Sequence, residues 1–267
     1  SGSITSDYNY TGMIGYATTA KVSGIHSSLD ITATANTWIG GIVAGANGAI
    51  TIAECTYDGT LNTSDGNAVG GIMGYANTGT IRNCLFSGTL EGGGASHFGG
   101  ILGYVNDSGF VGVKNCLCTG TIDTSKGTFT NYAYLIGNIN TKTKLSGIKN
   151  NYFKKVENSL PGYAGELANN ASLEAPNEVT AEQLASGEVC YLLNGSVSGG
   201  TNWYQTLGKD DYPYPFSTSK RVYKTLANAY INIDGPVQIG DADDLVNFAA
   251  MVNNGGTDLD AELTADI

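Results

Sequence analysis

The feature that most constrains this chain is an internal repeat with a period of about 30 residues. Gly71-Ile72-Met73-Gly74 and Gly100-Ile101-Leu102-Gly103 stand 29 residues apart, and Gly41-Ile42-Val43 stands 30 residues before the first of them. Gly12-Met13-Ile14-Gly15 lies a further 29 residues back, and the degenerate Tyr134-Leu135-Ile136-Gly137 follows the last copy by 34. A unit of this length cannot bury its own apolar face, so the stacking of successive units has to build the core.

Three further positions recur in phase with these glycines. The first is aliphatic and comprises Val22, Ile52, Ile81, Val113 and Ile148. The second lies three residues later and comprises Ile25, Cys55, Cys84, Cys116 and Asn151. The third lies six residues after the second and comprises Ile31, Leu61, Leu90 and Ile122. In a stack, each position becomes a column whose members are one strand spacing, about 4.8 Å, apart.

Within one unit the residue pattern is that of β-strands. Cys84, Phe86 and Leu90 share one parity, which places them on a buried face. The intervening residues, Asn83 among them, are predicted to face solvent. Ile81 has the wrong parity for the buried face, so we expect a bend or bulge between Ile81 and Cys84.

These patterns predict an all-β dominated fold. We expect a right-handed β-solenoid, or β-helix, of about five coils of ~30 residues over residues 1–158, with small helical capping segments toward the C-terminus. The sequence Ser1-Gly2-Ser3-Ile4 matches the later Asp58-Gly59-Thr60-Leu61, which favours a start part-way through a preceding repeat.

The cysteines, at positions 55, 84, 116, 118 and 190, are explained by this stacking. Their odd number and the absence of C-x2-C pairs argue against a zinc site or a full disulfide framework. Packed core thiols are the favoured interpretation, and a redox or metal role is the alternative.

Two more columns carry polar or aromatic side chains. One contains Asn47, Asn77, Asn106 and Asn140, whose stacked side chains are expected to bond one another at a turn. The other contains Tyr16, Tyr75 and Tyr104. If these rings point outward they form a strip on which sugars could stack, and if they point inward they belong to the core.

Composition and charge exclude several classes of partner. Charged residues make up 14% of the chain, and the net charge of -11 leaves no basic face for nucleic acid or for an anionic membrane surface. No apolar run approaches the ~20 residues of a membrane span, so we expect no membrane insertion. No D-x-[DN]-x-[DN]-G calcium loop and no targeting segment are visible, and no cofactor is expected.

The glycine motif resembles the GLUG-motif repeat, defined by a glycine, two hydrophobic residues and a second glycine. Three of the copies above fit it, whereas the second has Ala44 at the closing position and the fifth has Tyr134 at the opening position. The resemblance covers roughly residues 1–158. It implies a secreted, surface-exposed location in large proteins of gut and oral bacteria, including adhesin-like proteins and non-catalytic regions of surface peptidases.

The rest of the chain does not repeat. Residues 159–220 are predicted to form a C-terminal cap or lid, with a helix at about 180–193 that opens on a Thr180/Gln183 capping box. Residues 221–267, a strand plus a helix at about 242–253, resemble the entry cap of a GLUG solenoid. We expect them to begin a following module that is cut short at residue 267.

Motifs for catalysis are missing, since neither G-x-S-x-G nor H-E-x-x-H occurs. The coils do carry carboxylates that a polysaccharide hydrolase or lyase could use: Glu54, Asp58, Asp65, Glu91, Asp107 and Asp123. No unit combines several acids with a basic partner, so we expect no enzyme.

The sequence therefore favours a non-catalytic adhesion or display module of a bacterial cell-surface protein. Host or matrix glycans and proteins would be its partners, beside neighbouring modules of a larger protein. The alternatives are a carbohydrate-binding module that uses Tyr16, Tyr75, Tyr104 or Trp203, and a degenerate polysaccharide-degrading β-helix.

Overall fold

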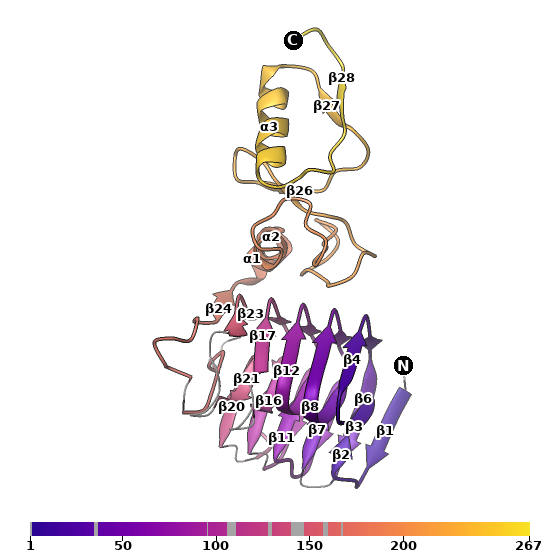
Figure 1. Ribbon diagram of the computed structural model, residues 1–267, viewed down its shortest axis with the longest axis vertical. Helices are drawn as coiled ribbons and strands as arrows, with labels where there is room; N and C mark the ends of the chain where they lie inside the picture. The colour runs from indigo at the N-terminus through magenta and orange to yellow at the C-terminus, as the bar shows by residue number, and fades with distance from the viewer. Residues whose placement is uncertain are drawn as a thin grey trace. The chain divides into compact units, whose positions relative to one another are not determined.

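The computed structural model describes residues 2–34, 37–94, 96–105, 111–127, 130–139, 147–156, 160–166 and 168–267. The chain forms two compact units, Ser1–Glu178 and Val179–Ile267 (Figure 1). The sequence-based boundaries at 158 and 220 do not coincide with this division. Residues 160–178 belong to unit 1 because they pack on its last coil, and residues 221–267 fall within unit 2.

Unit 1 is a β-solenoid whose coils each contribute to four sheets, which we name A to D. Sheet A contains β1 (Gly2–Ser6), β6 (Leu29–Ala33), β10 (Thr60–Thr63), β14 (Thr89–Gly92) and β19 (Thr121–Ile122). Sheet B contains β2 (Tyr10–Thr11), β7 (Trp38–Gly40), β11 (Ala68–Gly70), β15 (His97–Gly99) and β20 (Asn131–Ala133). Sheet C contains β3 (Ile14–Ala17), β4 (Ala20–Ser23), β8 (Val43–Ala53), β12 (Met73–Arg82), β16 (Leu102–Val105), β17 (Val111–Lys114), β21 (Ile136–Asn138) and β22 (Ile148–Lys149). Sheet D contains β5 (His26–Ser27), β9 (Thr56–Tyr57), β13 (Leu85–Phe86), β18 (Leu117–Cys118), β23 (Tyr152–Lys154) and β24 (Asn177–Val179).

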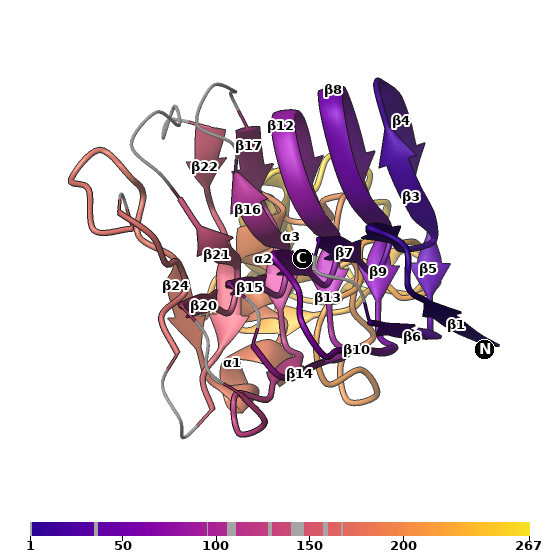
Figure 2. The same cartoon turned by 90° about the horizontal axis from the view of Figure 1, so that it is seen from below.

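The five coils are in the register that the repeat predicts. Strands of successive coils pair in parallel, and β4, β8, β12 and β17 lie side by side in both views (Figures 1 and 2). The aliphatic column is continuous, since Ile52 pairs with both Val22 and Ile81, and Val113 pairs with Ile81 and Ile148. Because these side chains are nearly all excluded from solvent, the stack forms one core, and the predicted β-solenoid of about five coils is confirmed.

Every coil turns from sheet C into sheet D at a residue with left-handed backbone geometry. These corner residues have φ between 51° and 66° and are Gly24, Glu54, Asn83, Asn115 and Asn150. Glycine and asparagine are the residues that adopt this conformation most readily. The corner is the bend expected between Ile81 and Cys84, and it lets side chains of both parities reach the core.

The prediction that Asn83 faces solvent is wrong, because this side chain is buried at the corner. Its Oδ1 accepts a hydrogen bond from Asn115 Nδ2 at 3.2 Å, and Asn150 Nδ2 donates to Asn115 Oδ1 at 2.9 Å. The three residues therefore form an asparagine column that links coils 3, 4 and 5.

The asparagine column predicted from the sequence, which contains Asn47 and Asn77, is a different one, and these two residues bond as expected. Asn77 Nδ2 donates to the backbone oxygen of Asn47 at 2.7 Å and lies 3.2 Å from its Oδ1. Asn106 and Asn140, the remaining members, lie outside the described residues.

The opening glycine of the repeated motif is required by the interior. A Cβ on Gly71 would lie 2.3 Å from the backbone oxygen of Gly100 and 2.3 Å from the Phe86 ring. A Cβ on Gly41 would lie 2.2 Å from the oxygen of Gly71 and 2.5 Å from the Tyr57 ring. Sheet D thus places an aromatic ring where only a glycine of the motif leaves room for it.

The cysteine columns are packed core thiols, and all five thiols are free and buried. Burial raises the pKa of Cys84, and a hydrogen bond with Cys84 together with burial raises the pKa of Cys55. Burial also raises the pKa of Cys118 to about 12. Because the thiolate is the reactive form, these side chains are unsuited to redox or metal chemistry.

We expect the thiols to be unreactive toward reagents in the native protein. Ellman's reagent should label none of the five in the folded chain and all of them after unfolding in guanidinium. A thiol that titrates in the native state at neutral pH would contradict the packing described here.

Residues after coil 5 cover part of the end of the stack. Leu135 N–H donates to the oxygen of Gly162 at 2.9 Å, and Ile139 N–H donates to that of Ala164 at 2.8 Å. On sheet D, Asn177 N–H donates to the oxygen of Asn151 at 2.8 Å. In sheet A, β19 is the last strand among the described residues.

Asn151 replaces cysteine in the last coil for a structural reason. Its Oδ1 accepts from Cys116 N–H at 3.0 Å, and its Nδ2 donates to the oxygen of Val113 at 2.8 Å and to the hydroxyl of Tyr163 at 3.0 Å. The buried amide thereby ties the last coil to the residues that cover it.

Unit 2 contains three helices and two small sheets in the described chain. Its elements are α1 (Ala181–Ala185), α2 (Glu188–Leu193), β25 (Tyr223–Lys224), β26 (Tyr230–Ile231), β27 (Val237–Ile239), α3 (Ala242–Asn253) and β28 (Ala261–Leu263). The Thr180/Gln183 capping box is present. The helix expected over 180–193 is two helices, because Gly187 has a left-handed φ of 90° between them.

Candidate functional site

The tyrosine column of sheet C points outward. Tyr75 pairs in register with Tyr104 and is partly exposed, while its neighbours Gly74 and Ala76 are buried. Tyr16 is 42% exposed. In the second coil the register position is Gly45, which pairs with both Tyr16 and Tyr75.

Trp38, from the adjacent strand of sheet B, fills the space above Gly45. A Cβ on Gly45 would lie 2.4 Å from the Trp38 ring. Trp38 stacks on Tyr75 with ring centroids 3.7 Å apart and an interplanar angle of 4°. Its centroid lies 6.2 Å from that of Tyr16 and 5.1 Å from that of Tyr10.

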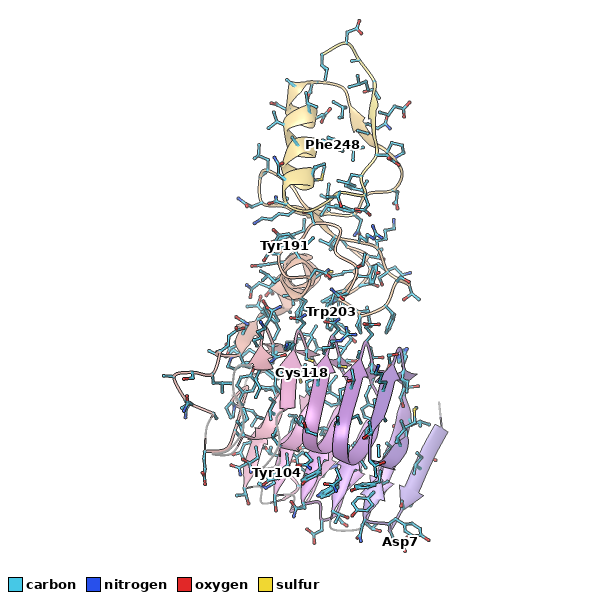
Figure 3. All side chains as sticks on the ribbon, in the orientation of Figure 1. Asp7, Tyr104, Cys118, Tyr191, Trp203 and Phe248 are labelled. Atoms are coloured by element: carbon cyan, nitrogen blue, oxygen red, sulfur yellow. The ribbon has the colours of Figure 1, made fainter. Side chains whose placement is uncertain are left out.

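The result is an aromatic strip across four coils, made of Tyr10, Tyr16, Trp38, Tyr75, Tyr104 and His97. Tyr104, labelled in Figure 3, lies 5.7 Å from Tyr75 and 4.9 Å from His97 between ring centroids. Burial lowers the pKa of His97, which also pairs with Asn131 at 3.3 Å.

The geometry of the strip favours a structural role for its central rings. The ring faces of Trp38 and Tyr75 stack on each other, so mainly the ring edges are left for a ligand. Sugars stack on ring faces, which these two residues therefore do not offer. Tyr10 and Tyr16, at the first coil, are the most exposed rings of the strip. The sequence analysis did not identify Trp38. The replacement of tyrosine by Gly45 at one position of the tyrosine column could have indicated that another aromatic side chain fills that space.

Gly45→Ala should displace the Trp38 ring and open its stack with Tyr75. We expect a loss of about 1–3 kcal/mol in the free energy of unfolding, the usual cost of overpacking, together with a weaker near-ultraviolet circular dichroism band. Gly24→Asn is the control, because no atom lies within 4 Å of its Cβ position and asparagine stands at the same left-handed corner in later coils, so the Trp38 band should be unchanged. An unchanged band in Gly45→Ala would contradict the stack.

Trp203 does not offer a binding surface. The residue is fully buried in unit 2, and its backbone oxygen accepts from Asn194 Nδ2 at 2.8 Å (Figure 3). Asn194 Oδ1 also accepts from Trp203 N–H at 3.0 Å. The proposed ligand-binding role of Trp203 is therefore replaced by a packing role.

Three of the six carboxylates considered for catalysis pair with neighbouring coils. Glu54 pairs with Arg82 at 3.1 Å, Asp58 with His26 at 3.0 Å, and Glu91 with Lys126 at 2.6 Å. Asp65 is exposed, and Asp107 lies outside the described residues. No group of three or more metal-ligating side chains occurs in the part of the chain that the structure describes.

The outer face of sheet A is a polar surface. One column runs Ser3, Asp30, Thr60, Thr89 and Thr121, and the next runs Thr5, Thr32, Asn62 and Glu91. Several of these side chains are exposed, among them Thr5, Thr32 and Thr121.

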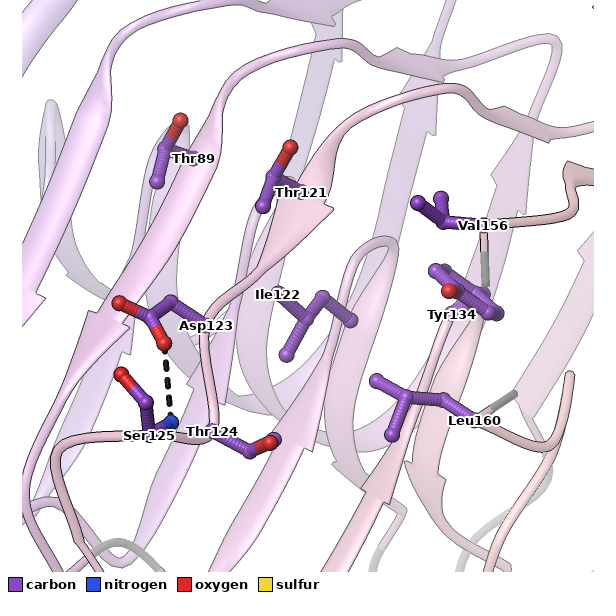
Figure 4. Close-up of a pocket in the computed structure, with 9 residues that line it drawn as sticks. All are labelled: Thr89, Thr121, Ile122, Asp123, Thr124, Ser125, Tyr134, Val156 and Leu160. Carbon is purple, nitrogen blue, oxygen red and sulfur yellow. Dashed lines mark hydrogen bonds between the residues drawn. The ribbon is translucent and has the colours of Figure 1, made fainter. Parts of the chain in front are cut away.

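A pocket of about 360 Å³ lies at the coil-5 end of this face (Figure 4). Hydroxyl groups and the Asp123 carboxylate line one side, and Ile122, Tyr134, Val156 and Leu160 line the other. Hydrogen bonds from Ser125, including N–H to Asp123 Oδ1 at 2.9 Å, lower the pKa of Asp123. Among the predicted carboxylates that the structure describes, Asp123 is the one that lines this pocket.

No helix in the described residues has the length and apolarity needed to span a membrane.

Comparisons with known proteins give little guidance. No family model matches the chain, and no curated protein matches it. Among solved structures, the chain is similar to a "putative immunoglobulin A1 protease from Bacteroides ovatus", with 17% identity and a TM-score of 0.42. That similarity covers 79% of this chain and 74% of the other, and at this level it carries no argument about activity.

Proposed function

We propose that this chain is a non-catalytic adhesion or display module of a secreted or cell-surface bacterial protein, of the GLUG-repeat type. The proposal rests on one observation: the chemically reactive side chains of the repeat serve mainly to hold the coils together. The coil cysteines are buried in the core, and the corner asparagines, the histidines and three of the six coil carboxylates contact neighbouring coils. The outward face of sheet A is left as a polar surface.

A rigid polar sheet suits binding without chemistry. Parallel coils fix the spacing of outward side chains at about 4.8 Å along the stack, so a long partner can contact several coils at once. The partner class would be host or matrix glycans and proteins, and neither nucleic acid nor a lipid bilayer suits the acidic chain.

The test is retention of the labelled chain on a panel of matrix proteins and glycans. Thr32→Lys changes an exposed position on the outer face of sheet A, and Thr51→Lys changes a half-buried position in sheet C, beside Lys21. We expect retention that falls with Thr32→Lys and persists with Thr51→Lys. No retention on any surface would overturn the proposal.

Carbohydrate binding is the second candidate, and the pocket beside Asp123 favours it over the stacked aromatic strip. Its apolar and hydroxyl-lined sides match the two faces of a sugar ring.

A further inference from the structure

We infer that the pocket at the coil-5 end of sheet A, beside Asp123, binds one or two pyranose rings of a neutral or amino-bearing glycan. The inference deepens the carbohydrate-binding form of the proposed function and rests on it. It assigns the site, the polarity of the ligand and the role of each wall.

The polar wall of the pocket is built by β19 and the turn that follows it, through Thr121, Asp123 and Ser125. Thr121 and Asp123 donate their N–H groups to β14, at 2.9 Å to Gly88 and 2.8 Å to Leu90. In a parallel pair alternate residues face the neighbouring strand, so the N–H and C=O of Ile122 point to the opposite side. Ile122 lines the pocket, and a ligand hydroxyl there can both accept from and donate to this backbone pair.

Asp123 sets the charge of the ligand. Hydrogen bonds from Ser125 hold its pKa below the ordinary range of about 4, so the carboxylate is ionised at neutral pH. A carboxylate accepts strong hydrogen bonds from sugar hydroxyls or from an amino group. The neighbouring Lys126 is paired with Glu91, so Asp123 carries the uncompensated charge here and disfavours uronic and sialic acids. We therefore expect a preference for glycans without acidic groups.

The apolar wall supplies the other half of the recognition. Val156 is 46% exposed at the pocket, and Leu160 and Ile122 are partly buried beside it. Tyr134 lies between Val156 and Leu160 (Figure 4). Its ring stacks on Phe153 with centroids 5.1 Å apart, which holds it in place. The C–H face of a pyranose would pack on this wall while its hydroxyls face Asp123 and β19.

The pocket is continuous with the threonine column of sheet A. Thr121 and Thr89 line it, and Thr60 is next in register. A longer glycan could therefore leave the pocket along a row of hydroxyls about 4.8 Å apart, and affinity should rise with chain length.

The experiment is calorimetric titration of the intact chain with three disaccharides, namely lactose, chitobiose and digalacturonic acid. We expect lactose or chitobiose to bind and digalacturonic acid not to bind. Asp123→Asn, which keeps the size of the side chain, should weaken binding about tenfold or more. Val156→Asp should also weaken it, and Asp65→Asn, an exposed carboxylate away from the pocket, should not. Unchanged far- and near-ultraviolet circular dichroism would show that each variant is folded.

Three results would overturn the inference. They are equal binding of digalacturonic acid, binding that Asp123→Asn and Val156→Asp leave unchanged, and absence of binding to all three probes. In the last case, retention of the chain on matrix proteins would leave the adhesion proposal standing, whereas loss of retention as well would remove both.

Discussion

Replacing Gly71 by alanine should destabilise the solenoid by about 3 kcal/mol or more, at the upper end of overpacking substitutions. The added Cβ would meet the backbone oxygen of Gly100 and the ring of Phe86, both at 2.3 Å. The oxygen belongs to the next coil and Phe86 is fully buried, so neither can move away without opening the stack. Urea unfolding followed by circular dichroism would measure the loss.

Gly24→Asn is the matched control for Gly71→Ala. Gly24 has a φ of 66° and open space around its Cβ position, and later coils already place asparagine at the same corner. We expect a change within about 0.5 kcal/mol, as for ordinary surface substitutions. Equal effects of the two variants would contradict the assignment of the motif glycine to the interior.

Phe86→Ala should cost about 3–5 kcal/mol, the range for removing a buried aromatic side chain. Phe86 is fully buried, lies 6.3 Å from Tyr57 between ring centroids, and contacts the glycines of two motif copies, Gly71 and Gly100. Removing the ring leaves a cavity that the coils cannot close, because their spacing is fixed by the parallel sheets. The free energy of unfolding again provides the readout.

Tyr8→Ala is the corresponding aromatic control. Tyr8 is 78% exposed, so its loss should change stability by less than about 0.5 kcal/mol. A destabilisation by Phe86→Ala no larger than that of Tyr8→Ala would show that sheet D does not fill the core.

The coil architecture was predictable because stacking repeats the same environment at a fixed sequence interval. Ile52 and Ile81 occupy one column for the same reason that Cys55 and Cys84 occupy the next, so each copy of the repeat reinforces the others. The period-2 pattern failed at Asn83, where a left-handed corner changes which side of the chain faces the core.

The candidate site was less predictable because it depends on departures from the repeat. Trp38 enters the aromatic strip only because its strand lies beside Gly45 in another sheet. The pocket lies beside β19, the last strand of sheet A in the described part of the chain, whereas residues near 162 and 177 add to other sheets. Asp123 was identified as an acid on the coils, but periodicity alone did not separate it from Glu54, which pairs with Arg82.

The measurement that tests the central claim most directly is a combined retention and turnover assay. The chain is incubated with immobilised glycans and matrix proteins, and both the retained chain and any released product are quantified by mass spectrometry. The account predicts retained chain with ligands of unchanged mass. Released fragments whose formation is abolished by substituting a coil carboxylate such as Asp123 would contradict it.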